Sequence, residues 1–280
     1  MTADDALDHE RKGANAGLNP MFGDWQHRFR FAPVSYREGG AKRAVFREAM
    51  QAELTNRFFY TGEIRLEITL HLDVQTVLET SDTADLDNYA KSIIDGLKGP
   101  TGIVLDDSQI QALVISYRDN YGRNGPFFDV EITASPDEFI LKPVSFYEMP
   151  DRLWYPASRL AWTDGEAKEL PEDQLYISLF MTREMSVVKI RSRHRLRELG
   201  FSRLAAYKQL IPIIMSVRGF HKGRIDSSFP ILDLKTWQTN FAAWKADCKD
   251  NQKIEYVERS VIEFKEHYER LAAALGTGEP

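Results

Sequence analysis

The amino-acid sequence predicts an α/β (α+β) domain followed by a mainly helical region. Residues 64–72 alternate between apolar and polar side chains, which is the period-two pattern of a half-buried strand. Residues 41–56 carry apolar side chains at the spacing of an amphipathic helix. Beyond about residue 145, the strongest patterns are two apolar stripes at helical spacing. Together these patterns favour a mixed first half and a helical second half.

The first predicted elements are a strand, a helix and a second strand. A short strand-like stretch covers residues 26–31. The helix over residues 41–56 follows, with its apolar side chains on one face at Val45, Phe46, Met50 and Leu54. In the strand over residues 64–72, every second side chain is Ile or Leu. One face of this strand is therefore expected to be buried.

A second helix and two further strands complete the first domain. After a polar loop at residues 80–84, residues 89–97 form a helix that Gly99 and Pro100 end. Residues 110–117 and 127–132 are predicted strands, joined by the turn-rich segment 120–125. The predicted order is β-α-β-α-β-β.

The composition of the chain, which has 280 residues and 43% hydrophobic content, suits two domains. Residues 1–20 have almost no large apolar side chains and are expected to form a mobile tail. Residues 21–145 would form the α/β domain, and residues 146–280 a mainly helical accessory domain whose role the sequence leaves open. The stretch from Trp154 to Trp162 is expected to be irregular. The two helical stripes, typical of core side chains, are Leu234, Trp237, Phe241 and Trp244, and then Val257, Val261, Phe264, Tyr268, Leu271 and Leu275.

The N-terminal composition and the hydropathy indicate a cytoplasmic protein. The first residues are polar and charged where a signal peptide would be apolar, and the single cysteine, Cys248, excludes an internal disulfide. The longest apolar run, near residues 210–217, is far shorter than the roughly 20 residues of a membrane helix. No membrane association is expected.

The charge is unevenly distributed along the chain. The formal net charge is -6, whereas DNA-binding domains are usually basic. Residues 183–224, however, hold 11 basic side chains against only Glu184 and Glu198. This segment can meet an anion, and the residues that could contact the phosphates of DNA, if the chain binds it, are Lys189, Arg191, Arg193, Arg195, Arg197 and Arg203. Alternatively, these basic side chains could form a solvent-exposed face, or they could pack against the acidic first domain of the same chain.

Acidic side chains cluster around the second predicted helix. Asp85 and Asp87 flank Leu86, so an extended entry to the helix would point both carboxylates to one side. Lys91 follows one turn later, and a strand beside the helix could deliver Asp106 or Asp107 to the same place. Oxygen ligands of this kind suit Mg²⁺ or Mn²⁺. Two bridged divalent ions can activate water and neutralise the leaving oxygen in phosphodiester hydrolysis, and Lys91 can stabilise the developing charge.

Each of these residues also has an ordinary structural interpretation. Asp87 could cap the helix, Lys91 and Asp95 could form an exposed pair, and Asp106 and Asp107 could lie in a solvated turn. The sequence contains no GxSxG, GxxxxGK[ST] or GxGxxG motif and no Cys/His spacing typical of a metal site. The acidic group is therefore the main candidate for chemistry.

Residues 85–97 (DLDNYAKSIIDGL), followed by residues 105–110 (LDDSQI), resemble the signature of RusA-like Holliday junction resolvases. The resemblance covers about residues 25–135. It implies a homodimeric, Mg²⁺-dependent endonuclease acting on branched DNA in recombination and repair, with Mn²⁺ as a substitute. It also implies that Asp85, Asp87 and Asp107, with Asp106 beside them, bind metal, and that Lys91 assists at the scissile phosphate.

Two other functions remain open. The chain could be a DNA-binding or partner-recruiting module on a nuclease fold, or a defence or mobile-element nuclease with a different DNA target. The C-terminal domain could contact phosphates, dock a protein partner or stabilise the dimer. Tyr121 and Arg123, in the predicted hairpin loop, are further candidate DNA contacts, and His71 is expected to be structural or solvent-facing.

Overall fold

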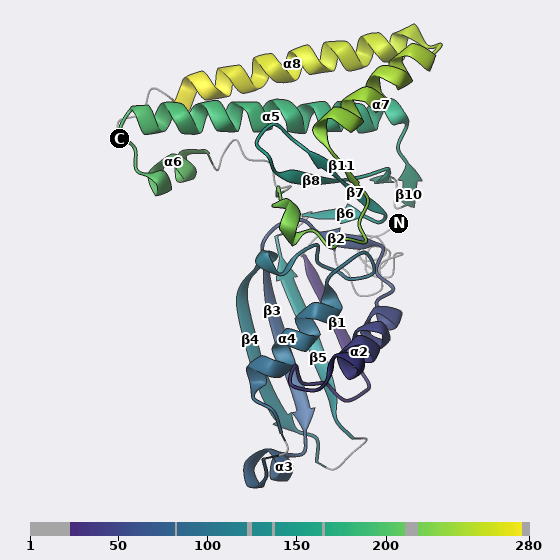
Figure 1. Cartoon of the computed structure of the whole chain (residues 1–280), viewed down its shortest axis with the longest axis vertical. Coiled ribbons are helices and arrows are strands. Elements are labelled where there is room, and N and C mark those ends of the chain that lie inside the picture. Colours follow the sequence, from purple (N-terminus) through teal and green to yellow (C-terminus); the bar gives the residue numbers. More distant parts are fainter. Residues whose placement is uncertain are drawn as a thin grey trace, which may run out of the picture. The chain divides into compact units, whose positions relative to one another are not determined.

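The computed structural model describes residues 23–81, 83–121, 125–135, 138–163, 166–210 and 218–275. The chain divides into two compact units (Figure 1). The first comprises Met1–Lys142 and Trp162–Glu166, and the second Pro143–Ala161 and Ala167–Pro280. Residues 162–166, which the sequence analysis placed in the second domain, thus belong to the first unit, and the predicted boundary near residue 145 stays a prediction. The tail expected at residues 1–20 lies outside the described residues.

The first unit is built on a four-stranded sheet in the order β1-β5-β3-β4. The central strand β3 pairs antiparallel with β5 and parallel with β4, and β1 pairs antiparallel with β5. Strands β3, β4 and β5 begin at the predicted residues, β1 lies two residues earlier than predicted, and the α/β fold class is confirmed. Their bounds are Asp24–Phe29 for β1, Ile64–Leu72 for β3, Ile110–Asp119 for β4 and Phe127–Ala134 for β5.

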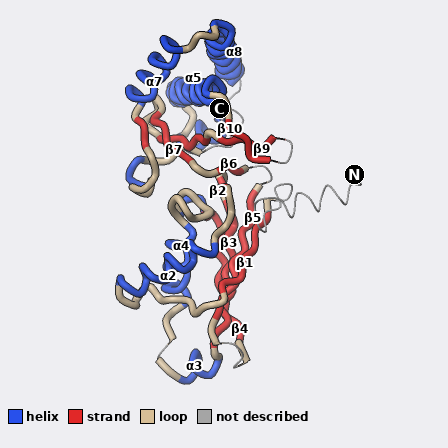
Figure 2. The backbone as a smooth tube through the Cα atoms, turned by 90° about the vertical axis from the view of Figure 1, so that its right-hand side faces the viewer, coloured by secondary structure: helices blue, strands red, loops and turns tan. Residues whose placement is uncertain are grey.

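Helices α2 (Gly40–Glu53) and α4 (Leu86–Leu97) lie on one face of this sheet (Figure 2). The five apolar side chains of β3 are buried, and the polar ones between them lie on the opposite face. From α2, Phe46 and Met50 are buried. A side chain at Gly96 of α4 would collide with Met50, so glycine permits the two helices to approach closely. These contacts form the core of the first unit and fix the position of α4.

Several short elements were not predicted. Strand β2 (Phe58–Tyr60) pairs antiparallel with β6 (Phe139–Leu141), and helix α3 (Val74–Glu79) begins after Asp73, which caps it. Helix α4 begins at Leu86, earlier than the predicted Tyr89. Its end agrees with the prediction, because Gly99 adopts a positive φ of 87° just after the helix.

The second unit contains long helices and a small sheet of β11, β7 and β8. The stretch around Trp154 is not irregular, because β8 (Trp154–Ser158) pairs antiparallel with β7 (Val144–Glu148). Strands β9 (Leu160–Thr163) and β10 (Glu166–Glu169) form a separate two-stranded sheet. The remaining elements are α5 (Glu172–Glu198), α6 (Arg203–Leu210), η3 (Lys222–Arg224), β11 (Ile231–Leu232), α7 (Leu234–Asp247) and α8 (Asn251–Leu275).

The predicted helical stripes lie in the core of the second unit. Trp237 of α7 and Val257 and Tyr268 of α8 are buried together with side chains of α5. Tyr176 of α5 stacks edge-on against Phe241, with ring centroids 5.0 Å apart. The mainly helical character of this region is therefore confirmed. Among the described residues, no helix has both the length and the apolar character needed to cross a membrane.

Candidate active site

The first turn of α4 carries the acidic pair. Asp85 is the N-cap residue, yet its carboxylate makes no capping hydrogen bond, and Asp87 lies in the first turn. Both side chains are exposed. The extended segment before the helix is therefore shorter than predicted, because the helix already begins at Leu86 and, of the acidic pair, only Asp85 has an extended backbone. The partial positive charge of a helix N-terminus favours anionic side chains there, which eases the placement of two carboxylates.

A loop from the β1–α2 connection is attached to this turn. The backbone N–H of Tyr36 donates to the carbonyl oxygen of Asn88 at 2.9 Å. Next to it, Nη2 of Arg37 lies 2.8 Å from Oδ2 of Asp85. Asn88 in turn donates from Nδ2 to Oδ1 of Asp87 at 3.3 Å. Arg37 and Tyr36 are thus neighbours of the acidic pair that the sequence analysis missed, because no pattern links residues so far apart.

Lys91 lies one turn beyond Asp87, as predicted, and its side chain is exposed. Its Nζ atom lies 3.6 Å from the centroid of the Tyr36 ring, and Cζ of Arg43 lies 4.1 Å from the same centroid. Hydrogen bonding of the Tyr36 hydroxyl with Arg43 and then with Lys91 lowers the pKa of Tyr36 below its ordinary value. The Tyr36 ring therefore holds two cations beside the acidic pair.

Asp106 has a structural role that the sequence analysis did not assign to it. It is buried, and its side chain accepts a hydrogen bond from the backbone N–H of Ser108 at 3.0 Å. With Gln109 it forms a capping box around the short helix η1 (Asp107–Gln109). The cap uses only Oδ1 of the carboxylate, and a carboxylate can accept more than one contact, so the predicted metal-binding role of Asp106 stays a prediction.

Asp107 lies at the opposite end of α4 from Asp85 and Asp87. Its Oδ2 atom is 3.2 Å from Nζ of Lys98, which also lies 3.1 Å from Oδ1 of Asp95. Burial alone would lower the pKa of Lys98, but its hydrogen bond to Asp95 and its nearness to Asp107 raise it. Asp95 follows Asp87 by about 12 Å of helix rise. Asp85, Asp87 and Lys91 are therefore together, and Asp107 is apart from them.

The donor set of one chain fits a divalent cation only in part. Among the described residues, no group of three or more His, Cys, Asp or Glu side chains is placed to hold a metal ion. Two exposed carboxylates are nevertheless a usual protein contribution to a Mg²⁺ site, in which water and substrate phosphates supply the other ligands. The Asp85 carboxylate, which caps no backbone group, fits that use.

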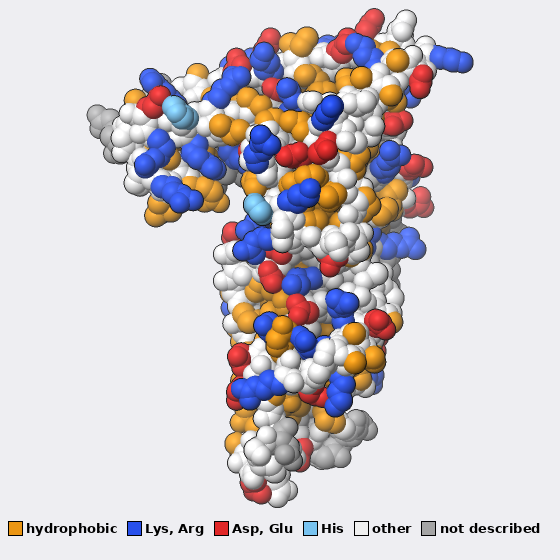
Figure 3. Space-filling view, in the orientation of Figure 1, with side chains coloured by type: hydrophobic (Ala, Val, Ile, Leu, Met, Phe, Trp, Pro, Cys, Tyr) orange, Lys and Arg blue, Asp and Glu red, His pale blue; other side chains and the backbone are white. Residues whose placement is uncertain are grey.

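The basic residues of the second unit lie on α5 and α6. Because α5 is a helix, the alternating positions do not form one row: Arg191 and Arg195 share one face, while Arg193 and Arg197 share another. These four side chains and Arg203 are exposed. Figure 3 shows Lys and Arg side chains gathered over α6 and the adjoining end of α5. The exposed residues remain candidates for DNA contact.

Lys189 differs from the other basic residues. It is buried, forms an ion pair with Asp151 and donates a hydrogen bond to the Tyr155 hydroxyl. Its predicted role as a DNA contact is therefore not compatible with this structure, since its ammonium group already compensates a buried carboxylate. Residues at every second position of a helix point in different directions. The alternating sequence pattern alone therefore did not indicate that Lys189 is buried.

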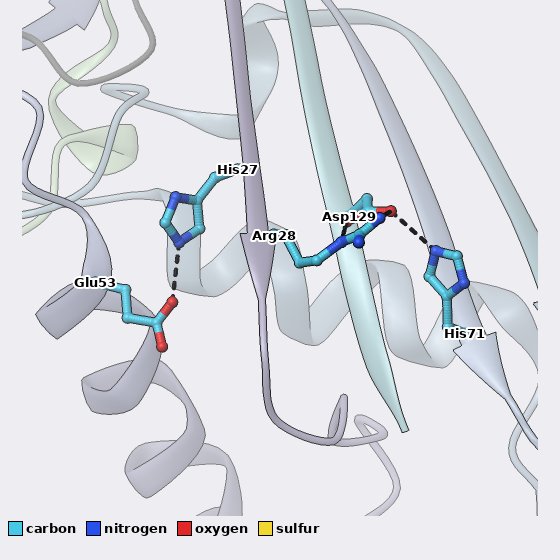
Figure 4. A network of polar contacts seen from close by, with 5 residues as sticks. All are labelled: His27, Arg28, Glu53, His71 and Asp129. Carbon is cyan, nitrogen blue, oxygen red and sulfur yellow. Dashed lines mark hydrogen bonds and ion pairs between the residues drawn. The ribbon is translucent and has the colours of Figure 1, made fainter. Parts of the chain in front are cut away.

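Two further polar contacts involve the β strands of the first unit, one within the sheet around Asp129 and one between His27 of β1 and Glu53 of α2 (Figure 4). Asp129 accepts hydrogen bonds from Nε of Arg28 at 2.6 Å and lies 2.9 Å from Nε2 of His71, while His27 contacts Glu53 at 2.9 Å. Desolvation alone would raise the pKa of Asp129, but the hydrogen bonds with Arg28 and His71 outweigh it and lower the pKa. His71 thus has a structural partner, in agreement with one of its two expected roles.

The predicted hairpin loop is described only in part. Tyr121 is 79% exposed and adopts a positive φ of 54°, so its ring faces solvent and stays a candidate DNA contact. Arg123 lies outside the described residues.

The fold and the acidic end of α4 define the first unit as a small α/β domain with carboxylates and a lysine suited to phosphodiester chemistry. Residues 18–133 match the model of the family described as Endodeoxyribonuclease RusA. The N-terminal half of the chain therefore carries a RusA endodeoxyribonuclease domain, and the resemblance inferred from residues 85–110 is confirmed. No curated protein matches the chain.

Proposed function

We propose that this chain is a Mg²⁺-dependent, structure-selective endodeoxyribonuclease that resolves Holliday junctions or other branched DNA in recombination and repair. The observation that carries the proposal is the joint position of Asp85, Asp87 and Lys91 at the exposed first turns of α4, within a RusA domain. We expect it to work in the cytoplasm, where its DNA substrate would be found.

Asp85 and Asp87 are the residues that would hold Mg²⁺, with Mn²⁺ as a substitute. When bound, the metal would lower the pKa of a coordinated water and neutralise charge on the phosphate oxygens. The start of α4 would fix the positions of the two carboxylates that bind the metal, since a helix positions side chains more exactly than a loop. Lys91 would hold a positive charge one turn away, where it can stabilise a phosphate that gains charge in the transition state.

Asp107 would join this site from a second copy of the chain. Within one chain it is held by Lys98 at the far end of α4. A homodimer with two-fold symmetry presents each surface twice, so Asp107 of one protomer can complete the acidic pair of its partner. A dimer also suits a four-way junction, which has two-fold symmetry and must be nicked on two strands.

The exposed arginines of α5 and α6 would supply contacts to DNA phosphates. Arg191, Arg193, Arg195, Arg197 and Arg203 keep this proposed role, and Lys189 does not. Arg191 and Arg195 make internal ion pairs with Glu269 and Glu198 at 3.3 and 3.7 Å, which an exposed site exchanges readily for phosphate. Beside them, Leu204 and Tyr207 of α6 are 62% and 50% exposed, which also favours docking of a protein partner there.

The test is cleavage of end-labelled four-way junction, replication fork and linear duplex, each with Mg²⁺ or EDTA, by the wild type and by Asp87→Asn. We expect paired symmetric nicks in the junction that need Mg²⁺ and disappear in Asp87→Asn, while binding persists. Normal cutting by Asp87→Asn would refute the site assignment. Tight binding without cleavage of any DNA would favour the recruiting module.

A further inference from the structure

Two cationic side chains lie over the Tyr36 ring, and a third, Arg37, forms an ion pair with Asp85. Lys91 and Arg43 lie over the Tyr36 ring at 3.6 and 4.1 Å from its centroid, and Arg37 is the residue that follows Tyr36. The Nε atom of Arg43 is buried and has no hydrogen-bond partner. Of these three cations, Arg37 is the one joined to the acidic pair by an ion pair, through Asp85.

The loop that carries Arg37 is held in a defined conformation. The N–H of Arg37 donates to Oγ of Ser35 at 3.2 Å, and the N–H of Ser35 donates to Oε1 of Glu38 at 3.2 Å. Ser35 is only 3% exposed, and the N–H of Tyr36 is bonded to α4. The Arg37 backbone is therefore fixed against the first turn of α4, and only its side chain is free to change partners.

The Arg37–Asp85 ion pair is easily exchanged. Each of its side chains is 69% exposed, and exposed ion pairs contribute little to stability because water and salt screen them. A divalent cation on Asp85 would compete with the guanidinium for the same carboxylate oxygens. A released guanidinium is well suited to phosphate, whose oxygens it can bind in bidentate fashion.

We propose that Arg37 is a DNA-phosphate ligand of this site, which Asp85 holds in place until a divalent metal ion takes over that carboxylate. The inference rests on the proposed function and deepens it by naming a residue that links metal binding to DNA binding. Arg37 would thus keep the acidic pair neutralised in the absence of metal and would then contact the phosphate next to the metal. Arg43 and Lys91 would remain on Tyr36 throughout.

The first test measures the binding of Mn²⁺ alone to the full chain by electron paramagnetic resonance. Arg37→Ala should bind Mn²⁺ about twofold to fivefold more tightly than the wild type, because the metal no longer displaces an exposed ion pair. Arg47→Ala is the matched control, since Arg47 is an exposed arginine of the neighbouring helix α2, and it should bind Mn²⁺ as the wild type does.

The second test is binding of a four-way junction in EDTA or in Ca²⁺, over a range of salt concentrations. Arg37→Ala should bind the junction more weakly in Ca²⁺, and the slope of log K against log salt should become less negative by about 0.9, as expected for one lost phosphate contact. The loss should be smaller in EDTA, where the wild-type Arg37 is engaged with Asp85. Arg47→Ala should change neither the slope nor its dependence on Ca²⁺.

The outcomes separate this inference from the proposed function. A wild-type chain that binds both ligands, with an Arg37→Ala variant indistinguishable from it, would overturn the role of Arg37 alone. Weaker Mn²⁺ binding by Arg37→Ala, or an equal loss of DNA binding in Ca²⁺ and EDTA, would also overturn it. A wild-type chain that binds neither Mn²⁺ nor DNA would overturn the proposed function and this inference together.

Discussion

The Nζ atom of Lys98 lies 3.2 Å from Oδ2 of Asp107. This contact holds Asp107 at the end of α4, about three helical turns beyond Asp87. A single chain therefore presents an acidic pair at one end of the helix and a third candidate ligand at the other. If all three aspartates serve one metal site, two protomers must share them.

Mixing of two inactive variants tests whether the site is shared. Asp87→Asn and Asp107→Asn should each be inactive alone. After co-refolding in equal amounts, about half of the dimers are mixed and each mixed dimer has one intact site, so about a quarter of wild-type nicking should return. The measurement is nicking of labelled four-way junction. Mixing Asp85→Asn with Asp87→Asn is the control and should restore nothing, because both residues belong to the same half-site. No recovery in the first mixture would contradict a shared site.

Lys91 is expected to act on the chemical step. Lys91→Ala should lower the single-turnover cleavage rate about 100-fold, the usual cost of losing one group that stabilises transition-state charge. Junction binding in Ca²⁺ should change far less. Tyr36→Phe, which keeps the ring beneath Lys91, should have a smaller effect on the rate. A different result would make Lys91 a DNA-binding residue. In that case the single-turnover rate would be unchanged, and Lys91→Ala would lose as much junction binding in Ca²⁺ as it loses cleavage at subsaturating enzyme.

The sequence predicted the sheet and both covering helices because their apolar periodicities are long and regular, as in residues 64–72. It also identified Asp85, Asp87 and Lys91, which are close in the chain and share one helix end. Contacts between distant segments were not predictable, and so Arg37 was missed. Among the alternating basic residues of α5, Lys189 was misinterpreted for a different reason, since helical geometry turns its side chain into the core.

Gln109 is expected to stabilise the first unit. It is fully buried, its Oε1 accepts hydrogen bonds from the N–H groups of Leu105 and Asp106 at 2.8 and 3.0 Å, and its Nε2 donates to the carbonyls of Tyr60 and Gly62. Gln109→Ala leaves these backbone groups without partners and should cost about 2–4 kcal/mol of unfolding free energy. Urea unfolding would measure this loss. Gln111→Ala, at an exposed neighbouring position, should cost less than about 0.5 kcal/mol. Equal effects of the two substitutions would contradict the role assigned to Gln109.

Lys142 should make stability depend on alkaline pH. Burial lowers the pKa of Lys142 to about 8, although its ammonium group donates to the carbonyl oxygens of Thr101 and Gly102. The unfolded chain, with an ordinary lysine pKa of about 10.4, binds more protons than the folded chain between these two values. Stability contributed by Lys142 should therefore rise as the pH increases from about 8 to about 10.

The comparison of wild type with Lys142→Met isolates this effect. Methionine cannot titrate, so the wild type should gain stability relative to Lys142→Met by up to about 3 kcal/mol between pH 7 and pH 10. Urea unfolding at several pH values measures the difference. Lys42→Met, at an exposed position of α2, should differ from the wild type by a constant amount over the same range. A constant difference for Lys142→Met as well would mean that the Lys142 amine is not desolvated, and that its carbonyl partners hold it in the charged form throughout.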